Sequence, residues 1–167
     1  MPVSATVVKE LREATGAGML DCKKALEETN GDFDKARAIL REKGFAQAAK
    51  RAERVTAEGL VHAYLHHNSR LGALVEVNCE SDFVARTEDF KSLVQQVALQ
   101  VAGASPLYLS IEEMPADATD SPKDVCLLSQ PFLLDESKTI EDLVKETIAK
   151  TGENIRIKRF ARFELGR

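Results

Sequence analysis

The hydrophobic residues between positions 73 and 101 change their spacing from every second residue to every third or fourth. In residues 71–79 apolar side chains alternate with the others, which is typical of a strand with one buried face. From Thr87 onward the spacing fits one face of a helix. The apolar positions are Ala73, Val75, Val77 and Cys79, followed by Phe90, Leu93, Val94, Val97, Ala98 and Val101. This order predicts a sheet with a helix across its apolar face.

Two further strands complete the predicted sheet. Residues 60–79 hold two β-rich runs separated by the turn-forming stretch HHNSRLG, which predicts a hairpin. A last strand is predicted in NIRIKRFARFEL at 154–165. Strict alternation in that strand leaves Phe160 alone on a charged face. The opposite face then carries Ile155, Ile157, Ala161, Phe163 and Leu165. The predicted fold class is α+β, with a three-stranded antiparallel sheet packed with helices.

The segment between the first helix of this domain and its last strand has two parts. Residues 104–131 are rich in proline and predict a loop region. A helix follows, because Thr139 and Asp142 have the spacing of a capping box and an apolar stripe comes after them. Gly152 is expected to end that helix.

The N-terminal residues 4–44 have helical spacing interrupted by glycines. Two glycines within three residues in TGAGML predict an exposed turn after a first helix. Gly31 and Gly44 predict the ends of a second and a third helix. The next stretch, FAQAAKRAERVTAEG, is rich in alanine and charge and is interpreted as a connector. The predicted division is a helical module at 1–45, a linker at 46–58 and an α+β domain at 59–167.

Charge and composition argue against several classes of protein. The formal net charge of −4 argues against a general nucleic-acid binder, since phosphate binding relies on surplus lysine and arginine. No apolar run is long enough to span a membrane, and the N-terminus resembles neither a secretory nor a transit peptide, so a cytoplasmic location is expected. The three cysteines lack CxxC spacing and indicate reduced thiols.

Motifs for covalent chemistry are also missing from the sequence. It contains no GxxxxGK[ST], GxGxxG, HExxH or GxSxG pattern, and TGAGML lacks a preceding strand. His62, His66 and His67 lack the carboxylate or cysteine companions of a metal site. We therefore expect a binding protein, not an enzyme, with no metal and no cofactor. A small hydrolase that uses His66 or His67 is an alternative that order along the chain leaves open.

The stretch CESDFVAR at 79–86 places Asp82 beside two apolar residues, Phe83 and Val84, where turn formers are usual. One interpretation is a surface for a partner. The other is structural: Phe83 lies seven residues before Phe90, in phase with the helical stripe, and Asp82 is a helix N-cap. Polar Arg86 and Thr87 interrupt the stripe. The pattern alone leaves both interpretations open.

Three long segments resemble the elongation factor Ts family. These are LREATGAGMLDCKKAL at 11–26, EVNCESDFVAR at 76–86 and the C-terminal segment that begins SQPFLLDESKTIEDLVKETIAKTGEN. The resemblance implies a guanine nucleotide exchange factor for elongation factor Tu. It implies that Asp82 and Phe83, with Val84, intrude near the Mg²⁺ and phosphate site of that GTPase. It also implies that the N-terminal module docks on the nucleotide-binding domain through Arg12, Met19 and Leu20.

This chain departs from the usual family pattern at several positions. Ser81 stands where threonine is usual, and Leu20 where many members have a second methionine. The stretch at 104–131 is shorter than in most members. Ala161 stands where some short members have a cysteine that crosslinks a dimer, so a noncovalent homodimer is expected. The location implied is the bacterial cytoplasm, with plastid stroma or mitochondrial matrix as alternatives.

The N-terminal module has a second resemblance, to ubiquitin-associated domains, which are three-helix bundles. A ubiquitin adaptor is therefore an alternative function for residues 4–44. That alternative leaves the stretch SDFVAR unexplained, and it also leaves the C-terminal segment without a role.

Overall fold

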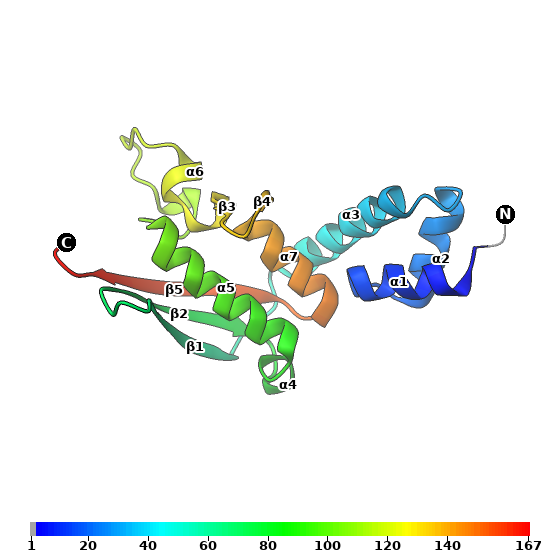
Figure 1. The fold of residues 1–167 in the computed structure, drawn as a ribbon, viewed down its shortest axis with the longest axis horizontal. Helices are drawn as coiled ribbons and strands as arrows, with labels where there is room; N and C mark the ends of the chain where they lie inside the picture. The colour runs from blue at the N-terminus through cyan, green and yellow to red at the C-terminus, as the bar shows by residue number, and fades with distance from the viewer. Residues whose placement is uncertain (1–2) are drawn as a thin grey trace.

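The computed structural model describes residues 3–167, which form a mixed fold of helices and strands (Figure 1). The N-terminal helices are α1 (Ala5–Thr15), α2 (Met19–Glu28) and α3 (Phe33–Arg51). Then come β1 (Glu58–Leu65), β2 (Leu71–Cys79), α4 (Asp82–Ala85) and α5 (Glu88–Ala104). The remaining elements are η1 (Ile111–Glu113), α6 (Pro122–Val125), η2 (Leu127–Ser129), β3 (Pro131–Phe132), β4 (Asp135–Thr139), α7 (Ile140–Thr151) and β5 (Ile155–Glu164). The predicted α+β class is confirmed.

The main sheet has the strand order β1-β2-β5, and both pairings are antiparallel. Helix α5 lies across one face of this sheet, and α7 lies beside α5 (Figure 1). The alternating residues of β2 and the apolar stripe of α5 are buried in one core cluster, as the sequence predicts. Burial of these side chains, at about 25 cal/mol per Å² of apolar surface, is the main stabilising contribution of the domain.

The last strand differs from its predicted pattern in the middle. The pairing with β2 shifts between Glu76 and Val77, so that Glu76 faces Arg159 and Val77 faces Ile157. Lys158 is thus an extra residue, a β-bulge, and the alternation changes phase after it. Phe160 therefore packs against the core, whereas Phe163 is exposed. The prediction that Phe160 stands alone on the outer face is wrong.

The three N-terminal helices have a small core of their own. It consists of Val8, Leu11, Cys22, Ala25, Leu26, Ala36 and Leu40. Ser4 and Asp32 cap α1 and α3 by accepting backbone N–H bonds, and Gly16 ends α1 with φ +69°, in the left-handed region that glycine tolerates. These local signals agree with the packing.

Helix α3 does not end at Gly44, as the sequence pattern predicts, but continues to Arg51. Gly44 is buried inside the helix, where α3 packs against α7. A Cβ built on Gly44 would lie 2.9 Å from the Cβ of Ala149 in α7. The glycine therefore serves close helix packing and does not end the helix. The first part of the predicted linker 46–58 is consequently helical.

A methyl group at Gly44 should destabilise the protein. Gly-to-Ala changes inside a helix ordinarily stabilise it by about 0.5–1 kcal/mol. Here the contact with Ala149 forces the helices apart, so we expect Gly44→Ala to lower the unfolding free energy by about 1–3 kcal/mol. Thermal unfolding measures the change. Adding Ala149→Gly should restore most of the loss, and a Gly44→Ala protein more stable than the parent contradicts this packing.

The proline-rich region 104–131 is not a simple loop. It contains η1, α6 and η2 and leads into the β3–β4 ribbon. Two buried glutamines attach it to α5. The Gln100 side chain donates to the Gln130 Oε1 (3.3 Å) and to the Pro131 carbonyl (3.1 Å), and it accepts from the Leu133 N–H (3.0 Å). Because these polar groups are paired, their burial carries little penalty.

Candidate partner-binding site

The short helix α4 projects from the end of β2 and lies beside the start of α5 (Figure 1). It contains Asp82 and Phe83, two of the residues predicted to contact a partner. Phe83 is 79% exposed, although it is one of the largest apolar side chains in the chain. Exposure of most of the ring forgoes much of the roughly 1.5–3 kcal/mol that its burial would give. An exposed aromatic ring on a projecting turn is accessible to a partner, in which its burial would contribute to binding.

Two capping residues explain why Phe83 points away from the core. The Ser81 Oγ accepts the N–H of Val84 (3.4 Å) at the start of α4. The Thr87 Oγ1 accepts the N–H of Phe90 (3.3 Å) and starts α5 as a new helix. The helical phase is therefore interrupted between Phe83 and Phe90. The structural interpretation, in which Phe83 is a first-turn core residue, is wrong, and the N-cap of α4 is Ser81 and not Asp82.

The neighbours of Phe83 have different environments. The Asp82 carboxylate forms an ion pair with Arg86 (2.8 Å), one turn later, and both side chains are exposed to solvent. Such a pair stabilises a helix by only about 0.2–0.5 kcal/mol, so Asp82 is easily released to another cation. Val84 is 8% exposed and belongs to the core cluster. Its side chain anchors α4 to the main core cluster.

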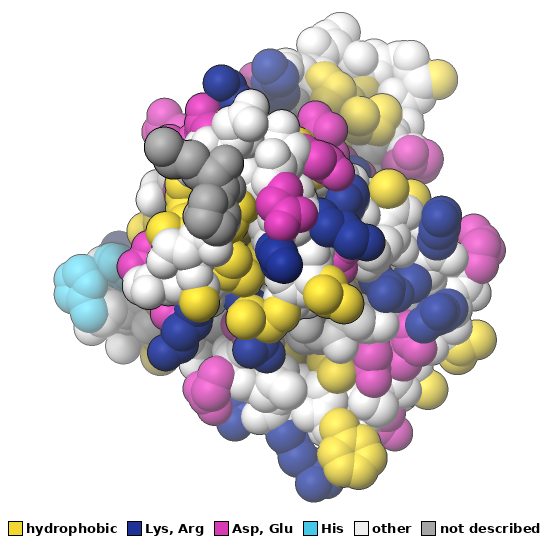
Figure 2. All heavy atoms as spheres, turned by 90° about the vertical axis from the view of Figure 1, so that its right-hand side faces the viewer, with side chains coloured by type: hydrophobic (Ala, Val, Ile, Leu, Met, Phe, Trp, Pro, Cys, Tyr) yellow, Lys and Arg dark blue, Asp and Glu magenta, His cyan; other side chains and the backbone are white. Residues whose placement is uncertain are grey.

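The second group of predicted contact residues lies at the N-terminal helices. Arg12 is exposed in α1, and Met19 and Leu20 are exposed at the start of α2. The turn between these helices, residues 16–18, brings the three positions to one end of the module. Figure 2 shows the side of the molecule on which the N-terminal helices lie, where apolar side chains are interspersed with charges of both signs. Arg12, Met19 and Leu20 therefore lie on α1 and α2, whereas Asp82 and Phe83 lie on α4.

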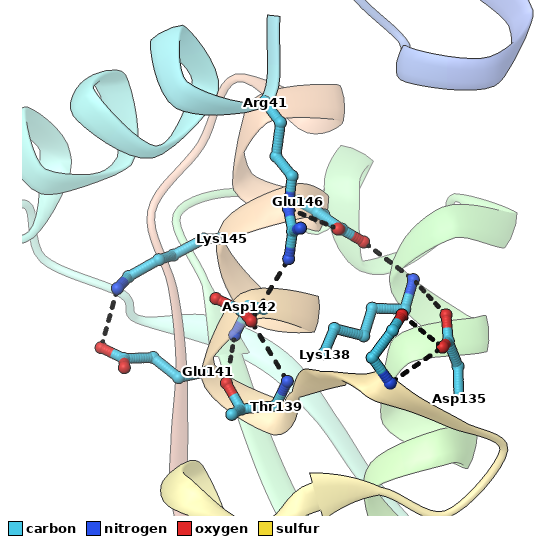
Figure 3. Close-up of polar contacts among 9 residues, drawn as sticks. Arg41, Asp135, Lys138, Thr139, Glu141, Asp142, Lys145 and Glu146 are labelled. Atoms are coloured by element: carbon cyan, nitrogen blue, oxygen red, sulfur yellow. Dashed lines mark hydrogen bonds and ion pairs between the residues drawn. The ribbon is translucent and has the colours of Figure 1, made fainter. Parts of the chain in front are cut away.

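An ionic network joins the N-terminal helices to the domain that carries α4. Arg41 of α3 pairs with Asp142 (3.2 Å) and Glu146 (3.3 Å) of α7 (Figure 3). Lys138 of β4 pairs with Glu146 (3.1 Å) on its other side. The pairs are partly exposed, so each contributes at most about 1 kcal/mol. Together with the packing at Gly44 they fix the orientation of the N-terminal module relative to the sheet.

The turn residues of the module also touch α7. A Cβ on Gly16 would lie 2.6 Å from the Cγ of Lys150. The TGAGML turn therefore packs against the C-terminal end of α7, and this contact restricts its movement relative to α7.

Groups that could carry covalent or metal chemistry are few in the described residues. No cluster of three or more histidine, cysteine or acidic side chains within residues 3–167 could hold a metal ion. The His66 and His67 rings lie 4.2 Å apart, and the Tyr64 hydroxyl is 3.0 Å from the His66 Nδ1. All three cysteines are buried, and burial raises the pKa of the Cys79 thiol to about 11, which keeps it protonated and unreactive at neutral pH.

The described part of the chain also contains no helix that is long and apolar enough to cross a membrane. The exposed large apolar side chains include Phe83 on α4, Met19 and Leu20 at the start of α2, and Val61, Leu65 and Phe163 on the main sheet. Exposed apolar side chains of this kind are available for contact with another protein.

Comparison with known proteins identifies the family. The family model described as "Elongation factor TS" matches residues 5–125 and 120–167. The elongation factor Ts of Coprothermobacter proteolyticus is 46% identical, over 99% of this chain and 100% of its own length. That of Fervidobacterium nodosum is 47% identical over the same shares, and that of a Synechococcus strain is 49% identical over 99% of this chain and 70% of its own length. The chain belongs to the elongation factor Ts family, a family of translation elongation factors.

The sequence pattern gave no sign of one group of residues near the site. Glu153 and Asn154, which follow α7, make hydrogen bonds to the residues just before α4. The partners are more than 70 positions apart in sequence, so no local spacing rule connects them. The only signal is that Gly152, Glu153 and Asn154 form a polar turn between a helix and a strand, where small polar residues are usual anyway.

Proposed function

We propose that this protein is the guanine nucleotide exchange factor of elongation factor Tu, and that it promotes GDP release by disturbing the Mg²⁺ and phosphate site. The observation that carries the mechanism is the exposed Phe83 on a four-residue helix beside Asp82. Family membership supports elongation factor Tu as the partner. The role requires no covalent chemistry, cofactor or metal of the protein's own.

The energetics of exchange follow from linkage. A GTPase holds GDP chiefly through phosphate-loop amides and Mg²⁺. A partner that binds the empty GTPase more tightly than the loaded one weakens GDP binding by the same factor. Burying the Phe83 ring in the partner supplies about 1.5–3 kcal/mol, equivalent to a factor of roughly ten to a hundred. Packed interiors rearrange between discrete states, so an inserted ring displaces neighbouring groups and is not absorbed smoothly.

The N-terminal residues Arg12, Met19 and Leu20 are proposed to dock on the nucleotide-binding domain of the GTPase. Two contact groups on one rigid body bind cooperatively, because the first contact raises the effective concentration of the second. The flexible Met19 side chain suits an apolar partner surface. Val84 is buried, and we do not include it among the proposed contacts.

The experiment that tests this function is the release of labelled GDP from elongation factor Tu. The release rate is measured with and without this protein, over a range of concentrations. A rate that rises to a plateau with concentration supports the proposal. A rate equal to the spontaneous one, with a folded protein and active GTPase, refutes it.

The division into a module at 1–45, a linker at 46–58 and a domain at 59–167 is retained as a proposal, with α3 crossing the first boundary. The resemblance of the module to ubiquitin-associated domains also stays a prediction. We propose a cytoplasmic location in a bacterium, with organellar compartments as alternatives.

A noncovalent homodimer is proposed through the outer face of the sheet. Its cross-strand rows are Leu65–Gly72–Phe163, Ala63–Leu74–Ala161 and Val61–Glu76–Arg159. The large apolar side chains in these rows are exposed in the monomer. Two such faces can stack as a sandwich about a twofold axis, since each is complementary to itself. Without a cysteine at 161, mass action alone holds the pair.

A charge on this face should prevent association. Leu65→Glu places a carboxylate in the row that also holds Phe163, and an unpaired buried carboxylate opposes dimer formation strongly. We expect Leu65→Glu to raise the dimer dissociation constant about a hundredfold or more. Leu134→Glu is the matched control, because Leu134 and Leu65 are both 66% exposed and Leu134 precedes β4, outside this sheet. Sedimentation velocity measures the dimer dissociation constant of both variants. A parent protein that is monomeric at high micromolar concentration contradicts the dimer.

A further inference from the structure

The Glu153 carboxylate holds the residue that starts α4. Its Oε2 accepts the backbone N–H of Ser81 (3.0 Å), and its Oε1 accepts the Ser81 hydroxyl (2.5 Å). Bonds to an ionised carboxylate are stronger than neutral ones, and two together fix the orientation of the donor. Glu153 follows Gly152, whose φ of +76° ends α7 just before β5 begins at Ile155. The end of one helix therefore clamps the beginning of another, 72 positions away in sequence.

This clamp determines how Ser81 caps α4. The Ser81 hydroxyl donates a hydrogen bond to Glu153, and its oxygen keeps a lone pair that accepts the N–H of Val84. Helix α4 has only four residues, too few to be stable by itself. Phe83, being exposed, gains little orientation from core packing. Its direction depends on the backbone of α4, and hence on the bonds that Ser81 makes.

Residues beside Glu153 connect the same turn to the N-terminal helices. The Asn154 N–H donates to Glu80 Oε1 (2.6 Å), and its side chain donates to the carbonyls of Arg54 (2.8 Å) and Ala52 (3.3 Å), just after α3. Asn154 is only 2% exposed, so these bonds are shielded from competing water. Glu80 also pairs with Arg54 (3.6 Å). The α7–β5 turn thus joins the base of the N-terminal module to the base of α4.

We propose that Glu153 is a positioning residue for nucleotide exchange: through Ser81 it holds Phe83 in the direction needed to enter the partner. The inference rests on the proposed function, because Glu153 acts only through Phe83. Glu153 itself makes no contact with the GTPase. Glu153 acts on the step at which Phe83 inserts, and the docking of the N-terminal module does not depend on it. Loss of the clamp should therefore lower the maximal release rate and leave the concentration for half-maximal release almost unchanged.

The test is the concentration dependence of labelled GDP release from elongation factor Tu. For Glu153→Ala we expect the maximal rate to fall about tenfold, because Phe83 is then held less well in the direction in which it acts. Half-saturation should stay within about twofold of the parent. Ser81→Ala should give the same pattern from the other side of the contact. Ser81→Thr keeps the hydroxyl and should retain the parent rate. Glu141→Gln is the matched control, because Glu141 is paired with Lys145 and lies in the first turn of α7, at the opposite end of the helix from Glu153.

The folded fraction of each variant is measured by circular dichroism at the assay temperature. A fall in rate that only follows the folded fraction overturns the inference, as does a fall confined to half-saturation. If the alanine variant unfolds, Glu153→Gln, which preserves the shape of the side chain, takes its place in the test. A parent rate in folded Glu153→Gln and Ser81→Ala proteins also overturns the positioning role. Phe83→Ala in the same assay separates the two proposals. If Phe83→Ala is defective and the Glu153 variants are not, only the positioning role fails. If Phe83→Ala releases GDP at the parent's stimulated rate, the role of Phe83 fails and the positioning role with it. The exchange function itself fails only if the parent protein does not accelerate release.

Discussion

Replacement of Phe83 by alanine should abolish most of the stimulated GDP release and leave the fold nearly unchanged. The ring is 79% exposed, so its removal creates no cavity and loses little buried surface. The ring's burial in the partner is worth about 1.5–3 kcal/mol, and we expect the release rate to fall roughly ten- to a hundredfold. Release of labelled GDP gives the rate, and thermal unfolding of the same preparation gives the stability.

Two variants make this result specific. Asp82→Ala should weaken release less than Phe83→Ala, because its carboxylate offers one polar contact and is already paired with Arg86. Leu134→Ala removes another exposed apolar side chain, from the segment before β4, and should leave the rate at the parent value. A Phe83→Ala protein that melts much earlier, yet releases GDP at the parent rate once folded, would show that Phe83 acts in folding and not in exchange.

The parts of the fold that the sequence predicts well are those decided by neighbours along the chain. Thr139 and Asp142 form the predicted capping box, with both reciprocal bonds present. The stripe of α5 and the alternation in β2 are also local patterns, and both are buried as predicted. Such signals depend on residues within four positions of each other, so the sequence contains them directly.

The errors arise where distant segments meet. Gly44 has the appearance of a helix end, but Ala149, more than a hundred residues later, requires a residue without a side chain there. The bulge at Lys158 is visible only in the register with β2, and it moves Phe160 to the core side. Burial and close packing overrule local propensity in both cases.

The residues of the candidate site were predictable from the sequence, but the hydrogen bonds that hold α4 in place were not. Phe83 was open to two interpretations, and the capping residues Ser81 and Thr87, six positions apart, mark the helix break that decides between them. Two possible N-caps so close together are a local signal that the apolar spacing had obscured. The clamp from Glu153 has no comparable signal, because hydrogen-bond partners across a fold follow no fixed spacing.

Phe90→Ala should have the opposite effect from Phe83→Ala, although the chemical change is the same and the positions are seven residues apart. Phe90 is 0% exposed and begins the buried stripe of α5 in the main core cluster. Truncation leaves a cavity that the surrounding side chains fill only partly, and the expected loss of unfolding free energy is about 3–5 kcal/mol. Urea denaturation measures this loss directly.

The pair of variants separates stability from exchange. For a chain of this size, a loss of 3–5 kcal/mol lowers the melting temperature by roughly 6–20 °C. Phe90 takes part in the core and has no exposed atoms for a partner, so the folded Phe90→Ala molecules should release GDP at the parent rate. Activity must therefore scale with the folded fraction as temperature or urea is varied. Folded Phe90→Ala protein that is inactive at low temperature would contradict this expectation. The start of α5 would then influence the partner surface on α4, across the helix break at Thr87.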